Sequence, residues 1–321
     1  MAHELEQDLE YVLERTASVW EVLAGTDLFI TGGTGFVGSW LLESFVWANR
    51  RLHLNARIFP LTRDPEKFRT EKPHLAHGEG VEILQGDLQT FQFPRRQFHY
   101  AIHAAAEVGA TQRILEMVKA HGVRRMLYTS SGAVYGEQPA DIENVGEEFA
   151  SPIEGCTPYG RAKRETEALC LAAVDAGLGV VIGRLFAFVG PYLPLEKNFA
   201  AGNFVRDARM GGPIRVEGDG TPLRSYLYAA DMAIWLWTLL IKGVPGRTYN
   251  VGSDQAIGIL DLARIVERVC GVKGGISVAS KPAAGVNPKR YVPSIARARE
   301  ELGLEPWIGL EEGIGRMFNF P

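Results

Sequence analysis

Apolar residues along the first two thirds of the chain alternate between short continuous runs and longer stretches with helical spacing. The runs predict strands at 27–31, 56–61, 81–85, 100–105, 125–130 and 179–184. Helix-like stretches follow the first run up to Asn49 and recur at 111–121 and 158–176. Strands that alternate with helices predict a parallel sheet covered on both faces. The expected fold class is therefore a doubly wound α/β fold.

The pattern changes after Arg184 to shorter elements. Helices are expected near 199–210 and at 229–242 and 259–270, and strands near 213–216 and 225–228 and at 248–251. Ser294 stands where an N-cap would start a closing helix, and Gly303 stands where a left-handed residue would end it. The predicted parts are an amphipathic N-terminal helix in 1–26, a sheet domain at 27–184 that also receives about 227–254, and a smaller α/β subdomain at 185–321.

Composition excludes several classes of protein. The 321 residues are 46% hydrophobic with a net charge of −4, and no basic block argues for nucleic acid. The longest uncharged run, 28–42, contains four glycines and is too short to cross a membrane. The acidic N-terminus does not resemble a secretory signal. Three cysteines, without a metal-ligand spacing, fit a reducing compartment, so we expect a cytoplasmic protein without a metal.

A glycine-rich segment joins the first strand to its helix, with glycines at Gly32, Gly35 and Gly38. Glycine permits a tight turn and lets a pyrophosphate approach the backbone, and the N-terminus of the helix offers N–H groups to phosphate. A structural turn is the competing interpretation. The place of the motif between strand and helix favours a dinucleotide site and a Rossmann-type fold.

Two residues near the ends of the next strands bear on the cofactor. A carboxylate at the end of the second strand would accept the ribose hydroxyls of NAD, but this chain has Arg63 there. Arg63 suits a 2′-phosphate or stacking on adenine, and the alternative is a solvated arginine beside Asp64. Asp87 follows the third strand where an adenine amino group would lie, and a turn aspartate competes. The cofactor expected is NAD or NADP, with a weak preference for NADP.

Tyr159 and Lys163 open a predicted helix four residues apart, and so share one face of it. A lysine ammonium there favours the phenolate of a tyrosine, which makes Tyr159 a candidate general acid or base. Ser131 follows the fifth strand and brings a hydroxyl to the sheet edge at which open α/β folds bind ligands. An ordinary serine cluster after a strand is the competing interpretation.

Together these segments resemble an extended short-chain dehydrogenase/reductase of the nucleotide-sugar epimerase/dehydratase branch. The resemblance covers roughly residues 25–320. The segments that carry it are TGGTGFVG (31–38), GDL (86–88), IHAAA (102–106), SSGAVYG (130–136), YGRAK (159–163), RLFAFVGP (184–191), VEGDGTPLRSYLY (216–228), YNVGS (249–253) and LEEGI (310–314).

The resemblance implies a role for each matching residue. Ser131, Tyr159 and Lys163 would be the catalytic trio, and Lys163 would also hold the nicotinamide ribose. The second half would bind a nucleoside-diphosphate sugar through Asn198, Arg224 and Arg290. A homodimer through the helices at 111–121 and 158–176 is also implied. The residues implied in cofactor binding are Gly32, Gly35, Phe36, Val37, Gly38, Arg63, Asp87, Leu88, Ala104, Ala105 and Lys163.

The chain departs from the family pattern at three places. Ala187 replaces the asparagine of R-x-F-N-V-Y-G-P. Gly132 and Ala133 stand after the catalytic hydroxyl, where members that dehydrate or decarboxylate usually carry acidic residues. Between Val108 and Gly109 the family normally has about twenty more residues, so we expect either an absent mobile loop or an unusually short helix at 111–121.

The expected activity is epimerisation or 4-ketoreduction of a nucleoside-diphosphate sugar through a 4-keto intermediate. A 4,6-dehydratase is the rival within enzymes. A dinucleotide-binding sensor or assembly subunit without catalysis is the rival from another class, and the presence of all three catalytic residues argues against it.

Overall fold

The computed structural model describes residues 5–105, 109–283 and 285–321, in two compact units. The first unit contains Met1–Val134, Pro158–Arg184 and Ala233–Tyr249. The second contains Tyr135–Thr157, Leu185–Met232 and Asn250–Pro321. The N-terminal helices thus group with the sheet. The segment 135–157, which we expected in the sheet domain, groups with the second unit.

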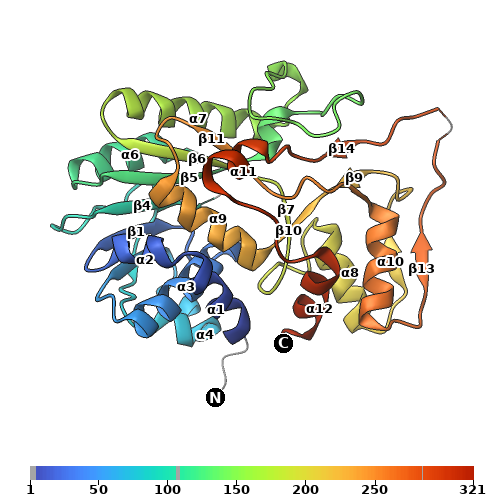
Figure 1. The fold of residues 1–321 in the computed structure, drawn as a ribbon, viewed down its shortest axis with the longest axis horizontal. Helices are drawn as coiled ribbons and strands as arrows, with labels where there is room; N and C mark the ends of the chain where they lie inside the picture. Colours follow the sequence, from blue (N-terminus) through green and yellow to red (C-terminus); the bar gives the residue numbers. More distant parts are fainter. Residues whose placement is uncertain (1–4, 106–108, 284) are drawn as a thin grey trace. The chain divides into compact units, whose positions relative to one another are not determined.

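A seven-stranded sheet is the frame of the first unit (Figure 1). Its strands are β1 (Asp27–Thr31), β2 (Arg57–Thr62), β3 (Leu84–Gln85), β4 (Tyr100–His103), β5 (Arg125–Ser131), β6 (Gly179–Leu185) and β11 (Thr248–Val251). Their order is β11-β6-β5-β4-β1-β2-β3. The pairs β2–β3, β1–β2, β1–β4 and β4–β5 are parallel. The order runs outward in both directions from β1 and β4, so the edge between them is the switch point at which doubly wound folds bind ligands.

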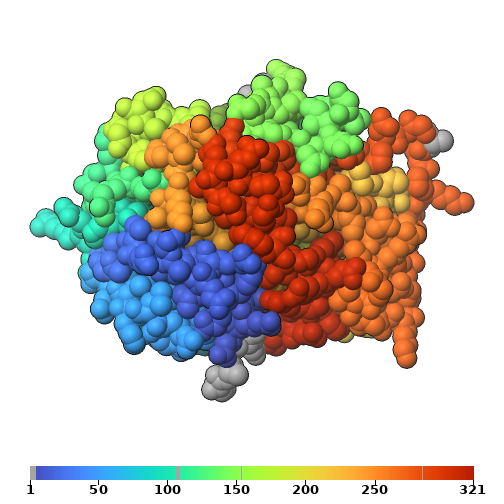
Figure 2. Space-filling view, viewed as in Figure 1, coloured from blue at the N-terminus to red at the C-terminus, as the bar shows by residue number. Residues whose placement is uncertain are grey.

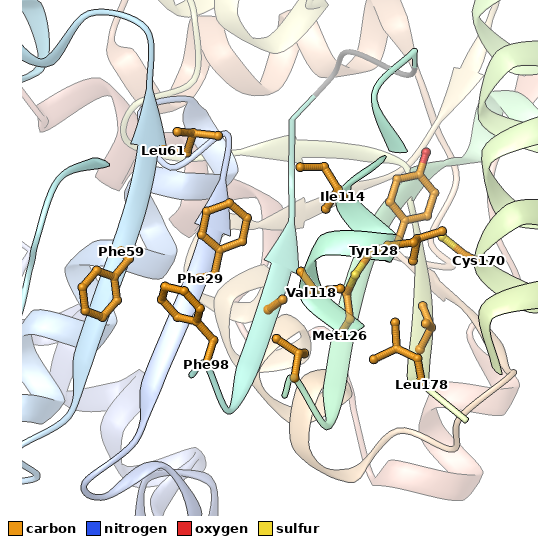
Figure 3. Close-up of a cluster of buried hydrophobic side chains, with 14 of the residues drawn as sticks. Phe29, Phe59, Leu61, Phe98, Ile114, Val118, Met126, Tyr128, Cys170 and Leu178 are labelled. Carbon is orange, nitrogen blue, oxygen red and sulfur yellow. The ribbon is translucent and has the colours of Figure 1, made fainter. Parts of the chain in front are cut away.

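Helices cover both faces of this sheet (Figure 1). They are α1 (Glu6–Arg15), α2 (Ala17–Leu23), α3 (Phe36–Leu52), α4 (Pro65–Glu71), α5 (Pro73–Ala76), α6 (Thr111–Ala120), α7 (Pro158–Asp175) and α9 (Ala229–Lys242). On one face, Ile114 of α6 and Cys170 of α7 join a buried cluster with Phe29 and Met126 of the sheet (Figure 3). On the other, Trp237 of α9 donates to Ser44 of α3.

The N-terminal segment forms two helices where the sequence predicts one within 1–26. The break is at Thr16, whose hydroxyl donates to the Val12 carbonyl at 2.5 Å and whose backbone leaves the helical region. A threonine that binds the backbone competes with helix continuation. Val12 and Trp20 are fully buried, and Trp20 packs against Trp237 at 5.0 Å between ring centroids. The segment, blue in Figure 2, is thus part of the core as well as of the surface.

The third strand is shorter than the predicted 81–85. Val81 pairs with Ile58 only as an isolated bridge, and the regular strand starts at Leu84. In this register Ile83 lies opposite Pro60 of β2. The Ile58 amide donates to the Gly80 carbonyl, so the peptide of Pro60, two residues on, also faces β3. Proline has no N–H to donate, and this missing bond interrupts the ladder.

The second unit consists of short strands and helices. Its strands are β7 (Ala187–Val189), β8 (Ile214–Val216), β9 (Leu223–Arg224), β10 (Tyr226–Tyr228), β12 (Ile257–Gly258), β13 (Ile276–Val278) and β14 (Arg290–Tyr291). Its helices are α8 (Ala200–Arg209), α10 (Ile259–Cys270), α11 (Ala296–Leu302) and α12 (Leu310–Asn319). The strands form small sheets in the orders β10-β7, β12-β9-β14 and β13-β8. Helices α8, α10 and α12 contact one another.

Of the two caps predicted for the closing helix α11, the C-terminal one is confirmed and the N-terminal one is displaced by one residue. Gly303 ends α11 in the left-handed conformation, with φ of 65°, as expected. The N-cap is Ile295 in place of Ser294, and no side chain caps it. Ser294 lies one residue earlier, where its Oγ accepts a long 3.4 Å bond from the Ala296 amide.

Candidate active site

The glycine-rich loop between β1 and α3 is shaped by close backbone contacts. Gly32 has φ of +70°, and a Cβ there would lie 2.6 Å from the Ala104 carbonyl carbon. A Cβ on Gly38 would overlap the carbonyl oxygen of Gly32. Both positions therefore require glycine, because the loop folds tightly onto itself and onto the segment after β4.

The same loop leaves the start of α3 suited to an anion. Gly35 is the N-cap and no side chain caps the helix, whose first turn contains no acidic residue. The backbone amides and the dipole of a helix N-terminus attract phosphate. The cradle formed by Gly32, Gly35 and Gly38, together with this N-terminus, fits the pyrophosphate of a dinucleotide.

A buried polar group lies under the switch point. His103, at the end of β4, pairs in register with Thr31 of β1, and its Nδ1 lies 2.7 Å from Thr31 Oγ1. Its Nε2 lies 3.1 Å from Thr111 Oγ1 at the start of α6. Thr31 Oγ1 also accepts from the Ala105 amide at 3.3 Å. These bonds hold the Ala104–Ala105 backbone beside the glycine loop, at the place where both residues are expected to meet the cofactor.

The residues after β2 and β3 are only partly as expected. Arg63 is exposed, and Asp64 caps α4 by accepting from the Lys67 amide at 2.9 Å. Asp87 accepts from the Gln89 amide at 2.9 Å, so it does form the turn that competed with the adenine role. Leu88 packs against the buried cluster of the sheet. Their contacts with a cofactor stay predictions.

Lys72, between α4 and α5, contacts the glycine loop, although no sequence motif points to it. Its ammonium donates to the Thr34 carbonyl at 3.0 Å and to Ser39 Oγ at 2.5 Å. Burial lowers the pKa of Lys72, while Glu71 and Glu43 act in the opposite direction. No local pattern signals this contact, because more than thirty positions separate the lysine from the loop it braces.

The catalytic candidates Ser131, Tyr159 and Lys163 meet in the first unit as predicted. Ser131 ends β5, and its Oγ accepts from the Ala133 amide at 3.2 Å. Tyr159 lies on the first turn of α7 and forms a hydrogen bond with Ser131, although 46% of its surface stays exposed. Lys163 is 2% exposed, donates to the Thr129 carbonyl at 3.0 Å, and lies 5.8 Å from the Tyr159 ring centroid.

The electrostatics of the trio differ from the expectation. Burial raises the pKa of Tyr159 above 10.0, and the hydrogen bond with Ser131 opposes the rise. Burial lowers the pKa of Lys163 from 10.5 to about 8. The prediction that Lys163 makes the phenol more acidic is thus wrong for this arrangement, because desolvation dominates and the ammonium is bonded to a carbonyl. Tyr159 is a protonated acid near neutral pH.

A buried ion pair supports the trio and was also missed. Glu167 is 5% exposed, and Arg184 donates to its Oε2 at 2.7 Å and to its Oε1 at 3.0 Å. Ser130 Oγ donates to Glu167 Oε1 at 2.5 Å. The signal that was available is the spacing, because Glu167 follows Lys163 by four residues on the same helix face.

The substrate candidates belong to the second unit. Asn198 is exposed in the loop before α8. Arg224 lies on β9 with its guanidinium 5.8 Å from the Tyr291 ring centroid, and Arg290 lies on β14 with Nε 3.4 Å from the Glu143 carbonyl. Arg290 pairs in register with Leu223, not with Arg224. Successive residues of a strand point to opposite faces, so this register places the two arginines on opposite faces of the small sheet.

One prediction concerns residues that the structure does not describe, and two concern absences that hold for the described residues alone. The junction of Val108 and Gly109 lies outside the described residues, although α6, at ten residues, is as short as expected. Within the described ranges no group of three or more His, Cys, Asp and Glu side chains is arranged to hold a metal ion. No helix among those residues has the length and apolar character to cross a membrane.

Comparisons with known proteins place the chain beside one family of enzymes. Residues 106–252 match the model of the NAD dependent epimerase/dehydratase family. UDP-glucuronic acid decarboxylase 1 of Arabidopsis thaliana is 29% identical over 306 residues, which cover 90% of this chain and 68% of that protein.

Solved structures share the fold. An epimerase from Methanothermobacter thermautotrophicus matches with a TM-score of 0.78 at 22% identity, over 95% of each chain. A variant of UDP-glucuronic acid 4-epimerase from Bacillus cereus, in complex with NAD, matches with a TM-score of 0.78 at 21% identity, over 92% of this chain and 98% of that one.

The doubly wound sheet, the glycine cradle and the Ser-Tyr-Lys trio define a dinucleotide-dependent enzyme of the short-chain dehydrogenase/reductase class. The chain is similar to the NAD dependent epimerase/dehydratase family, whose model matches residues 106–252, and to a relative of that class over 90% of its length. The resemblance stated from the sequence is thereby confirmed.

Proposed function

We propose that the protein is a nucleotide-sugar epimerase or 4-ketoreductase that acts through a 4-keto intermediate. The observation that carries the proposal is the meeting of Ser131, Tyr159 and Lys163 at the carboxyl edge of the sheet that also carries the glycine cradle. Curated and solved relatives named as nucleotide-sugar decarboxylases and 4-epimerases support the substrate class.

Each residue of the trio has a distinct task in this proposal. A bound nicotinamide dinucleotide supplies the hydride acceptor. Tyr159, protonated near neutral pH, gives its proton to the 4-keto oxygen in reduction, and in oxidation its phenolate takes the proton of the sugar 4-hydroxyl. Its exposed surface leaves it open to a substrate. Ser131, bonded to the phenol, fixes its direction. Lys163 lies behind both, with its ammonium 5.8 Å from the Tyr159 ring centroid, and would hold the ribose of the bound dinucleotide.

The residues after Ser131 favour epimerisation or ketoreduction over elimination. Loss of water across carbons 5 and 6 needs a base and an acid besides Tyr159. Gly132 and Ala133 form the short 3-10 helix after Ser131 and cannot transfer protons. Loss of a positioned acid or base typically costs about 10²–10⁴ in rate. We therefore do not propose a 4,6-dehydratase.

The second unit binds the nucleotide in this proposal. Arg224 is the candidate for the diphosphate, because a guanidinium forms paired hydrogen bonds with phosphate oxygens. Asn198 and Arg290 are further candidates. The opposite strand faces of the two arginines favour Arg224 as the main contact, and Arg290 as a contact made only after its side chain turns from Glu143.

We further propose that NADP is accepted at least as well as NAD, because the exposed Arg63 stands where NAD enzymes have a carboxylate. Mass spectrometry of cofactor released from denatured protein, beside binding titrations with both cofactors, tests this. Binding of NAD with no binding of NADP would refute it.

A homodimer through α6 and α7 is proposed from an exposed apolar surface. Leu169 and Leu171 of α7 are 39% and 40% exposed, and the flanking Ala168 and Ala172 are exposed too. A second copy of α6 and α7 would cover them. Light scattering that gives a monomer at micromolar concentration would contradict this proposal.

The substrate class is tested by thermal-shift assays with UDP-, dTDP-, GDP- and CDP-sugars, because a bound ligand stabilises the folded state. We expect one nucleotide series to raise the unfolding temperature of the wild type. Arg224→Ala should remove that rise and leave the rise with the dinucleotide. The absence of any rise with every sugar nucleotide would contradict the proposal.

A further inference from the structure

A buried carboxylate connects three elements behind the candidate catalytic residues. Glu167 on α7 binds Arg184 of β6 through two nitrogens and accepts from Ser130 of β5. Ser130 directly precedes Ser131, and Lys163 is one helical turn before Glu167. The carboxylate is thus tied to the strand end that carries one member of the trio and shares a helix face with another.

We propose that Glu167 is a positioning residue of the active site: its charge keeps the Lys163 ammonium in place, and its bond with Ser130 fixes the strand end that carries Ser131. The proposal rests on the proposed function for the meaning of the trio. Glu167 touches no substrate in it, and acts only through Lys163 and Ser130.

The balance of charge around Lys163 makes this role necessary. Lys163 is 2% exposed, and its ammonium donates to the Thr129 carbonyl, so little water stabilises its charge. Burial lowers its pKa, and Cys170 and then Glu167 act in the opposite direction. The titratable or charged groups near Lys163 come from four elements: His103 on β4, Tyr128 on β5, Arg184 on β6, and Tyr159, Glu167 and Cys170 on α7.

Glu167 is the one carboxylate among these groups, and its charge raises the pKa of Lys163. His103 is neutral because burial lowers its pKa to about 3, and burial raises the pKa of the Cys170 thiol to about 12. Burial also raises the pKa of Tyr128. The charge of Arg184 would repel the Lys163 ammonium if its ion pair with Glu167 did not compensate it. Near neutral pH Glu167 is therefore the group that supports the charge of Lys163.

The test is a direct titration of Lys163 in the folded protein. Selective labelling of lysine at Cε allows the pKa to be followed by NMR, and Lys163→Arg identifies the signal. We expect the wild type to titrate near pH 8. Glu167→Gln should move the midpoint down by roughly one unit, as expected for loss of an opposite charge nearby. At pH 8 the charged fraction would then fall from about a half to about a tenth.

Two variants separate charge from structure. Glu165→Gln removes the same charge from an exposed position of the same helix, and should leave the Lys163 midpoint unchanged. Arg184→Lys keeps the charge of the ion pair but not its fork, and should also leave the midpoint in place. If Glu167→Gln does not fold, Glu167→Gln with Arg184→Gln leaves no uncompensated charge. Its Lys163 midpoint is then compared with that of Arg184→Gln alone, so that only the charge of Glu167 differs, and we expect the lower midpoint in the double variant.

Turnover provides the second readout once a substrate is found. The alkaline limb of the pH profile should move down with the Lys163 midpoint in Glu167→Gln and stay in place in Glu165→Gln. An unchanged midpoint in Glu167→Gln, or an equal shift in both variants, overturns the inference. The titration needs no substrate, so a failure of the proposed sugar chemistry leaves its result intact and is recognised separately by the absence of turnover.

Discussion

The side chains of Thr31 on β1 and His103 on β4 form a hydrogen bond, with 2.7 Å between Thr31 Oγ1 and His103 Nδ1. The imidazole is fully buried at the switch point, and burial lowers its pKa from 6.5 to about 3, with a smaller effect from Lys163. His103 is therefore neutral at every pH at which the protein would work, and bridges two threonines as a hydrogen-bonding spacer.

The first prediction is acid sensitivity that depends on His103. The unfolded chain takes up a proton below pH 6.5 and the folded chain does so only near 3, so stability is lost as pH falls between these values. At pH 4 the loss from this residue is about 3 kcal/mol. His103→Gln should lose correspondingly less stability between pH 7 and 4 in urea unfolding, whereas the exposed His77→Gln should behave as the wild type. Equal acid sensitivity of all three proteins would contradict the prediction.

The second prediction is that replacing the buried Lys163 by an apolar residue stabilises the protein. The folded-state pKa of Lys163, about 8, is below its unfolded value of 10.5, so burial of the charge costs stability below pH 8. The free energy of unfolding of Lys163→Met should exceed that of the wild type by about 3 kcal/mol at pH 7. That difference should shrink as pH rises toward 10.5, where the unfolded lysine is also neutral. A variant less stable than the wild type at pH 7 would refute this account of the buried charge.

The third prediction compares two glycines of the cradle without any ligand. Gly38→Ala should destabilise the protein by about 2 kcal/mol, because its Cβ would overlap backbone atoms of Gly32 and Gly33. Gly35→Ala is the matched control, since its Cβ would meet the nearest atom at an ordinary 3.5 Å. We expect its unfolding free energy to stay within about 0.5 kcal/mol of the wild type. The reverse order of the two variants would show that the loop is not packed as described.

The fourth prediction separates catalysis from cofactor binding. Tyr159→Phe removes the phenol but keeps the ring, and the glycine cradle does not depend on that hydroxyl. Turnover should fall by at least about a hundredfold, with dinucleotide affinity nearly unchanged in a binding titration. Retained turnover would exclude Tyr159 as the acid or base, and lost dinucleotide binding would mean that the variant disturbs the loop itself.

Local signals allowed the sequence to predict the parts of the site that depend on neighbouring residues. The glycine loop is a strand, a turn and a helix in succession, and Tyr159 and Lys163 lie four apart on one helix. The short β3 was predictable in principle, because Pro60 lies in β2 and cannot donate to a neighbour. The contacts of Lys72 with Thr34 and Ser39 were not, since they join segments far apart in the sequence.

The pKa of Tyr159 likewise depends on contacts between segments that are far apart in the sequence. Its spacing from Lys163 suggested a more acidic phenol, but the sign depends on burial by residues from other elements, which no spacing reveals. The ion pair of Glu167 with Arg184 is of the same kind, because it depends on α7 lying beside β6.

Product analysis tests the central claim most directly. Purified protein is incubated with hexose nucleotides, and with 4-keto-sugar nucleotides plus reduced cofactor, and the products are analysed by mass spectrometry and NMR. The proposed function predicts either an isobaric product with inverted configuration or a sugar reduced at carbon 4, in both cases abolished by Tyr159→Phe. A product that has lost water or carbon dioxide at an enzymatic rate, or no turnover of any sugar nucleotide, would contradict it.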